Sequence, residues 1–171
     1  MGVIQALGYQ IPTPNAAQRA VWHVSASPPG AWLFAKVLHR TDAAVLEVTG
    51  GRFSLTEVLA GIPILTVITT GARTGQRRQN PLLGVPVGDE LAVIGTHFGQ
   101  PGTPAWYYNL KAHPLIELAY RGKVIPARAR EAEGEDWSGV WAQARRLYGG
   151  YESYARRIRG RSIHIMVLEQ I

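Results

Sequence analysis

The chain has 171 residues and a formal net charge of +6, with 46% hydrophobic and 18% charged residues. This apolar fraction excludes a disordered chain, and the length suits one domain with a core of its own. The absence of cysteine excludes a disulfide framework, a cysteine-ligated metal and thiol catalysis. A pI near 10.0 is compatible with binding to nucleic acid, to an anionic membrane surface or to a small anionic ligand, and also with a merely solvated basic surface. The positions of the arginines along the chain must therefore distinguish between these possibilities.

The first 30 residues carry four prolines and are expected to form a loosely structured arm, with a short helix over 16–24. Neither a secretory signal nor an apolar stretch long enough to cross a bilayer is recognisable, which predicts a cytoplasmic protein. Residues 31–48 predict two short amphipathic helices, the second capped by Thr41 or Asp42. They are expected to pack against the body of the protein. The alternative is a peripheral membrane contact or a lid over an apolar site.

From Pro63 onward, the sequence is dominated by short segments with β-branched and apolar residues. Strands are expected over 64–70, 77–87, 91–96, 115–120, 124–130 and 163–168, and helices over 104–112, 135–147 and 151–158. Short strands joined mainly by turns predict an α+β fold with an antiparallel sheet. Their number favours a closed or split β-barrel with flanking helices. The expected organisation is an arm over 1–30 and a single split-barrel domain over 31–171.

A glycine-flanked basic loop, residues 71–75, follows the first buried strand and is continued by Arg77 and Arg78. It lacks the spacing of a Walker loop, and no helix follows it as in a dinucleotide fingerprint. Backbone N–H groups, arginine side chains and the Thr74 hydroxyl together suit a phosphate or a carboxylate. The alternative interpretation is a basic hairpin turn on the surface.

Aromatic residues recur in two places. Tyr148, Tyr151 and Tyr154 are spaced by three, so they fall along one side of a helix. They could wall a pocket for a planar or apolar ligand, although ordinary half-buried packing is equally compatible with the pattern. Trp106 and Leu110 are expected to be core anchors, whereas Asn109 needs a polar partner.

The five histidines share no metal-ligand spacing, and no metal site is expected. His97 follows a strand in a glycine-rich loop and is the one histidine considered for a site. His164 is expected to be a satisfied core residue of the last strand. The acidic residues at 131, 133, 135 and 136 are expected to be solvated, and no nucleophile motif is present.

Three stretches occur in order along the chain: LTVITTGARTGQRRQNPL (65–82), PAWYYNLKAHP (104–114) and YGGYESY (148–154). With them, the chain resembles the deazaflavin-dependent nitroreductase (quinone reductase) family from about Trp32 to Glu169. The resemblance implies a split β-barrel and a cofactor, coenzyme F420. This cofactor is a phosphorylated 8-hydroxy-5-deazaflavin with an oligoglutamate tail.

The resemblance also implies which residues form the site. The cofactor would be bound by the basic loop, the strand after it, the end of the third strand and the start of the next helix, which implies Arg73, Thr74, Arg78, Gln79, Asn80, Pro81, Leu82, Gly95, Thr96, His97, Ala105, Trp106, Tyr107 and Asn109. The substrate side would be formed by Thr96, Tyr148, Tyr151 and Tyr154. Ala72 and His97 stand where relatives often carry basic residues, which predicts weaker contacts to the tail.

The function that follows is hydride transfer from reduced F420 to a quinone, enone or nitroaromatic acceptor, with the cofactor supplying the chemistry. Tyr151 is the leading candidate for the catalytic proton donor. Two alternatives remain at this point: a split-barrel reductase that uses FMN, and a non-enzymatic fatty-acid or lipid-binding protein. Nucleic-acid binding is not expected, because no reader motif is present.

Overall fold

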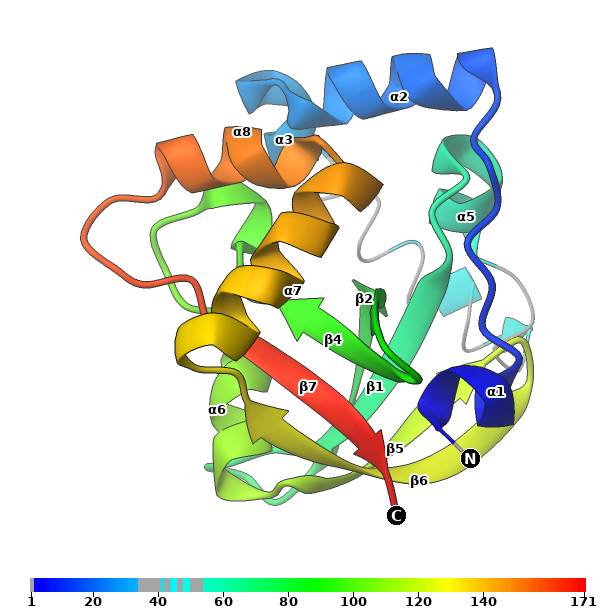
Figure 1. The fold of residues 1–171 in the computed structure, drawn as a ribbon, viewed down its shortest axis with the longest axis vertical. Coiled ribbons are helices and arrows are strands. Elements are labelled where there is room, and N and C mark those ends of the chain that lie inside the picture. Colours follow the sequence, from blue (N-terminus) through cyan, green and yellow to red (C-terminus); the bar gives the residue numbers. More distant parts are fainter. Residues whose placement is uncertain (1, 34–40, 42–43, 46–47, 50–53) are drawn as a thin grey trace.

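The computed structural model describes residues 2–33, 41, 44–45, 48–49 and 54–171 (Figure 1). Most of the amphipathic helix pair expected over 31–48 lies outside these residues, as does its cap Asp42. Within the described residues, no helix is both long and apolar enough to cross a membrane.

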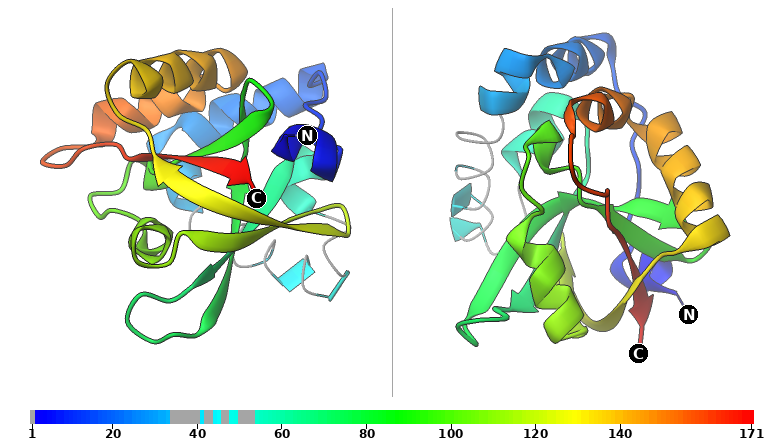
Figure 2. Two further views of the ribbon diagram at one scale, coloured as in Figure 1. Left: turned by 60° about the horizontal axis from the view of Figure 1, so that its bottom comes forward. Right: turned by 90° about the vertical axis from the view of Figure 1, so that its left-hand side faces the viewer.

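One antiparallel sheet of seven strands forms the body of the protein, in the order β2-β1-β5-β6-β7-β4-β3. The strands are β1 (Ile64–Thr70), β2 (Arg77–Leu83), β3 (Val85–Val87), β4 (Glu90–Ile94), β5 (Leu115–Tyr120), β6 (Lys123–Glu131) and β7 (Ile165–Gln170). The single strand expected over 77–87 is divided at Gly84 into β2 and β3, which lie at opposite edges of the sheet. Because Gly84 alone connects these two edge strands, the two edges must lie close together, and the sheet therefore curls on itself (Figure 2). This confirms the α+β split barrel.

The two faces of the sheet carry separate cores because side chains alternate along each strand. Leu91 and Val93 of β4 belong to a cluster inside the curl, together with residues of α1 (Val3–Leu7) and α6 (Ala105–Ala112). Ala92 and Ile94 of the same strand belong to a second cluster beneath α7 (Gly134–Leu147) and α8 (Gly150–Arg157). The expected helices of this half of the chain are therefore confirmed within a residue or two.

The expectation of a loosely structured N-terminal arm is wrong for its first ten residues. Val3 and Leu7 of α1 are 0% and 2% exposed and pack in the inner core. The Tyr9 hydroxyl accepts the Gly84 N–H at 3.1 Å and lies 3.0 Å from the carbonyl oxygen of Pro63. Tyr9 thus supports the junction where the sheet curls, a long-range role that local composition does not reveal.

Three further helices lie toward one end of the barrel (Figure 1). The expected helix over 16–24 is α2 (Ala16–Ala26), which begins with a capping box between Asn15 and Gln18. It is followed by α3 (Pro28–Leu33) and later in the chain by α5 (Leu55–Ala60). The Trp22 indole N–H donates to the Ala60 carbonyl at 2.6 Å, which ties α2 to the end of α5. This layer covers the open end of a cavity.

Candidate functional site

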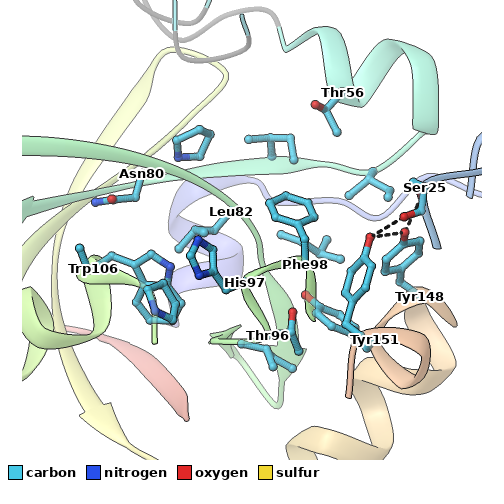
Figure 3. A pocket seen from close by; sticks show the side chains of 18 residues that line it. Ser25, Thr56, Asn80, Leu82, Thr96, His97, Phe98, Trp106, Tyr148 and Tyr151 are labelled. Atoms are coloured by element: carbon cyan, nitrogen blue, oxygen red, sulfur yellow. Dashed lines mark hydrogen bonds between the residues drawn. The ribbon is translucent and has the colours of Figure 1, made fainter. Parts of the chain in front are cut away.

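A cavity of about 320 Å³ lies between the barrel and the helix layer (Figure 3). Its walls come from five parts of the chain: α2, the region around α5, strands β2 and β4, the segment from the end of β4 to the start of α6, and the tyrosines around α8. The lining residues are Ser25, Thr56, Ile62, Ile64, Asn80, Pro81, Leu82, Leu83, Ile94, Thr96, His97, Phe98, Pro104, Ala105, Trp106, Tyr148, Tyr151 and Tyr154. The lining has no carboxylate, lysine or arginine, so it suits a largely apolar, planar ligand.

One wall is built by β2 and fixed by an amide. The Asn80 Nδ2 donates to the Val67 carbonyl at 3.0 Å and to the Thr69 hydroxyl at 3.2 Å, both on the neighbouring strand β1. Pro81 pairs with Thr66 in the same ladder, where its ring faces the cavity rather than interrupting the strand. Trp106 lies near Asn80 and Leu82 in Figure 3. Together these side chains form a flat, mostly apolar surface.

The tyrosines converge on the cavity as expected, but not along one helix. Tyr148 lies between α7 and α8, whereas Tyr151 and Tyr154 belong to α8. The Tyr148 hydroxyl lies 2.6 Å from Ser25 Oγ and 3.0 Å from the Tyr154 hydroxyl. Gly150 permits this arrangement, because a Cβ there would lie 2.2 Å from the Tyr148 ring.

Tyr151 differs from its two neighbours. The Ser25 hydroxyl donates to the Trp22 carbonyl, and the Tyr154 hydroxyl donates to the Ser25 carbonyl. Because both of these protons are already used, the Tyr148 hydroxyl donates its own proton to Ser25 Oγ. The Tyr151 hydroxyl has no hydrogen-bond partner among the residues that the structure describes, although its side chain lines the cavity. Burial raises the pKa of Tyr151 well above its ordinary value, with a smaller contribution from Tyr148. Tyr151 therefore stays protonated and can donate to a ligand.

The basic loop lies beyond the cavity, where β1 passes into β2. Asn109 of α6 holds it, accepting the Ala72 N–H at 2.9 Å and donating to the Thr69 hydroxyl at 3.2 Å. Arg77 pairs with Glu117 at 2.7 Å, while Arg73 has no carboxylate partner among the described residues. The exposed loop therefore presents cationic groups at the outer end of β2, the strand whose residues from Asn80 onward line the cavity.

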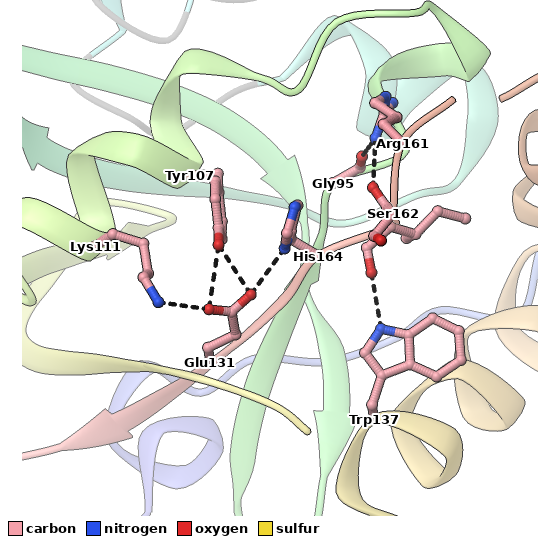
Figure 4. A network of polar contacts seen from close by, with 9 residues as sticks. Gly95, Tyr107, Lys111, Glu131, Trp137, Arg161, Ser162 and His164 are labelled. Atoms are coloured by element: carbon pink, nitrogen blue, oxygen red, sulfur yellow. Dashed lines mark hydrogen bonds and ion pairs between the residues drawn. The ribbon is translucent and has the colours of Figure 1, made fainter. Parts of the chain in front are cut away.

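Tyr107 and Glu131 are placed differently from expectation (Figure 4). The Tyr107 hydroxyl donates to Glu131 at 3.0 Å, and its ring stacks on His164 with centroids 4.0 Å apart. Glu131 also accepts from Lys111 at 2.7 Å and from His164 Nδ1 at 2.8 Å. Glu131 is therefore a partly buried anchor and not a solvated residue. His164 is satisfied but partly exposed, and it lies just before β7 instead of within the core.

Glu131 makes the stability of the fold depend on pH. Burial raises the pKa of its carboxyl, but hydrogen bonds from Lys111, His164 and Tyr107 outweigh burial, and the net effect lowers that pKa. A lowered pKa contributes stability that is present above the unfolded value of about 4.3 and is lost as the pH falls toward the folded value. We expect Glu131→Gln to be less stable than the wild type at pH 7, with the difference shrinking from pH 5 to pH 3. Urea unfolding across this pH range measures it, and a constant difference would contradict the assignment.

Ten of the seventeen residues expected in the site line the cavity: Asn80, Pro81, Leu82, Thr96, His97, Ala105, Trp106, Tyr148, Tyr151 and Tyr154. Arg73, Thr74, Arg78 and Gln79 lie exposed on the loop and the start of β2. Gly95, Tyr107 and Asn109 do not line the cavity. The Tyr107 hydroxyl bonds to Glu131 instead, and the Asn109 amide bonds to the basic loop.

Sequence reasoning missed eight of the lining residues, among them Ser25 and Phe98. Phe98 follows His97 directly, and this adjacency is a signal that could have found it. Ser25 carried no such signal, because its contact with Tyr148 spans 123 residues of chain. Within the described part of the chain, no cluster of three or more histidine and acidic side chains could hold a metal ion.

A curled antiparallel barrel with a mostly apolar cavity and an arginine-bearing loop at the end of its wall strand is the arrangement of a protein class suited to a planar ligand with an anionic tail. The family model of the F420H(2)-dependent quinone reductases matches residues 37–170, and the chain belongs to this family. It is accordingly an F420-dependent oxidoreductase whose cofactor is coenzyme F420. Family membership favours F420 over FMN and an enzyme over a lipid-binding protein.

Similar proteins agree with this assignment. The F420H(2)-dependent quinone reductase Rv1261c of Mycobacterium tuberculosis is 30% identical over 126 residues, which cover 70% of this chain and 84% of the relative. The structure of an F420-H2 dependent reductase, FDR-A, is 35% identical with a TM-score of 0.57, covering 63% of this chain and 94% of that one. A structure described as a domain-swapped dimer is 30% identical with a TM-score of 0.60, covering 82% and 99%.

Proposed function

We propose that the cavity between β2 and the tyrosines is the site of hydride transfer to a quinone, enone or nitroaromatic acceptor, with Tyr151 as the proton donor. The observation that carries this proposal is the Tyr151 hydroxyl, which belongs to a side chain lining a mostly apolar cavity and has no hydrogen-bond partner among the described residues. A donor without a protein partner, facing an apolar cavity, is suited to an oxygen atom on a bound ligand.

The residues present fit coenzyme F420. A cavity of about 320 Å³ has room for a tricyclic ring system but not for a phosphate and a chain of glutamates as well. Strand β2 leads out of the cavity from Asn80 to Arg77, a path of roughly 10 Å, and ends at the basic loop. There, Arg73, Arg78, the Thr74 hydroxyl and exposed backbone N–H groups would hold the anionic tail.

Residues of this chain would bind the cofactor, orient its ring and protonate the acceptor. When bound, reduced F420 supplies a hydride from its C5 carbon, which brings two electrons and one proton to the acceptor. Trp106, Pro81 and Leu82 would keep the ring flat against the β2 wall, which brings the reacting atoms together. The apolar lining excludes water from the reacting atoms. Tyr151 would give the second proton to the acceptor oxygen and regain one from solvent, so a quinone leaves as a hydroquinone.

Titration of the protein with oxidised F420, followed by its absorbance or fluorescence, tests the proposal. We expect saturable binding at micromolar concentrations, not displaced by FMN, and turnover of reduced F420 with members of a panel of quinones, enones and nitroaromatics. Absence of binding would overturn the assignment of this cavity. Binding with quinone turnover alone would narrow the acceptor to quinones.

A further inference from the structure

The cavity wall formed by residues 95–100 is held from behind by a side chain that does not line the cavity. We propose that Arg161 is a positioning residue for the cofactor site, because its guanidinium fixes the conformation of this loop. The inference rests on the proposed function, since it concerns the same cavity. Thr96, His97 and Phe98 of the loop line that cavity, whereas Arg161 lines a different pocket and lies beside Gly95 at the start of the loop (Figure 4).

Both Nη atoms of the guanidinium donate to backbone carbonyls, three of them in the loop, whereas the buried Nε has no hydrogen-bond partner among the described residues. Arg161 Nη1 donates to the carbonyl oxygens of Gly95 at 2.9 Å and of Ser162 at 3.1 Å. Nη2 donates to those of Thr96 at 3.0 Å and Gln100 at 3.1 Å. The two Nη atoms carry four hydrogens, and four carbonyls receive them. Only a planar fork offers this number of donors in fixed directions, so lysine is not an equivalent replacement.

The loop needs such a clamp because its backbone is strained. His97 and Phe98 have φ angles of 49° and 55°, and Gly99 follows with 79°. Non-glycine residues persist in the left-handed region only where the surroundings hold them there. The start of the loop is bonded to its neighbours, with the Gly95 N–H donating to His164 and the Thr96 N–H to Ile94. Its strained part is held by the Gly99 N–H to Thr96, the Gln100 N–H to His97, and a contact of 2.9 Å between His97 Nδ1 and the Gly102 carbonyl oxygen. Without the hydrogen bonds from Arg161, the loop backbone would relax toward the negative φ angles that non-glycine residues ordinarily adopt. Its side chains would then withdraw from the cavity wall.

Two neighbouring observations support this role. Arg157 extends the clamp by donating to the Ala26 carbonyl at 2.8 Å and to the Phe98 carbonyl at 3.4 Å. Arg161 has no carboxylate partner among the described residues, and burial lowers the pKa of its guanidinium. A partly buried cation without a carboxylate partner is costly unless its N–H groups are hydrogen-bonded, and here four carbonyl oxygens accept from the two Nη atoms. Arg159, two residues away, is exposed and has no recorded interaction with the described part of the chain.

The test compares Arg161→Gln and Arg161→Lys with the same replacements at Arg159. Two quantities are measured: the Kd for oxidised F420, and amide hydrogen exchange of residues 95–100 in the cofactor-free protein. For Arg161→Gln we expect a Kd about tenfold higher and exchange at Gly99 and Gln100 about tenfold faster. Arg161→Lys should fall between Gln and wild type, and the Arg159 variants should match the wild type. At saturating cofactor, the kcat of Arg161→Gln should stay within about threefold of wild type, because the weaker binding raises the KM for reduced F420 instead.

Three results would overturn the inference. They are unchanged exchange in a folded Arg161→Gln, unchanged F420 affinity despite a loosened loop, and failure of both Arg161 variants to fold, which would make the clamp a requirement of folding instead. A wild-type protein that does not bind F420 would contradict the proposed function alone. In that case the exchange measurement on the cofactor-free protein still decides whether Arg161 holds the loop.

Discussion

Replacing Tyr151 with phenylalanine is expected to lower kcat for quinone reduction by about 100-fold, the typical contribution of a positioned proton donor. The Kd for F420 should stay within about threefold of wild type, because the aromatic ring that lines the cavity is retained. Since burial raises the pKa of Tyr151, its hydroxyl remains neutral below that raised value and donates throughout the range from about pH 6 to pH 9. The ratio of wild-type to variant rate should therefore be independent of pH across this range. Stopped-flow oxidation of reduced F420 at several pH values measures both quantities.

Two other tyrosines serve as comparisons. Tyr154→Phe removes a hydroxyl that donates to the Ser25 carbonyl, so we expect a loss of about 1–2 kcal/mol in the free energy of unfolding. Its effect on kcat should be smaller than that of Tyr151→Phe, since its proton is already engaged. Tyr108, which is 55% exposed on α6, provides a null control as Tyr108→Phe. A Tyr151→Phe variant with unchanged kcat would mean that solvent supplies the proton and that Tyr151 only shapes the cavity.

The sheet was predictable from local pattern, whereas its closure was not. The β-branched run of Ile64–Thr70 and the turns between the later strands predict the antiparallel strands within about two residues at their ends, although the strand expected over 77–87 is divided into β2 and β3. Closure depends on Gly84 and on Tyr9, which meet across 75 residues of chain. A proline-rich N-terminal stretch gives no local sign of such a contact, so composition alone suggested a loose arm. Long-range packing was the physical information that the sequence pattern lacked.

The site was predicted in part for a related reason. The resemblance pointed to segments that line the cavity or adjoin it, but within each segment the direction of a side chain depends on its tertiary partners. Trp106 and Tyr107 are adjacent on one helix; one faces the cavity and the other donates to Glu131. Asn109 was expected to need a partner, and it has two, which turn its amide toward the loop. The clamp by Arg161 had no sequence signature, because its acceptors are backbone carbonyls.

Replacing Arg73 and Arg78 together with alanine is expected to weaken F420 binding by roughly 30- to 100-fold, because charge-assisted contacts to the phosphate and carboxylates are lost. Both side chains are exposed, so the wild-type affinity should fall with salt more steeply than that of the variant. The double variant Arg128→Ala/Arg159→Ala removes the same net charge from exposed positions outside the loop. It should change the affinity by less than about threefold if location, and not total charge, draws the tail.

A deazaflavin fragment without the phosphate and glutamates separates ring from tail. Wild type and Arg73→Ala/Arg78→Ala should bind this fragment equally, whereas they differ for the whole cofactor, so the coupling is between the loop and the tail. Equal losses for fragment and whole cofactor would mean that the loop acts on the cavity wall through β2 and not on the anionic groups. Equal losses of F420 affinity in the Arg128→Ala/Arg159→Ala variant would mean that the net positive charge of the whole chain attracts the cofactor, and not the two arginines of the loop. A loss confined to the whole cofactor would assign the two arginines of this loop to the tail, and the net charge of +6 would then have a local role.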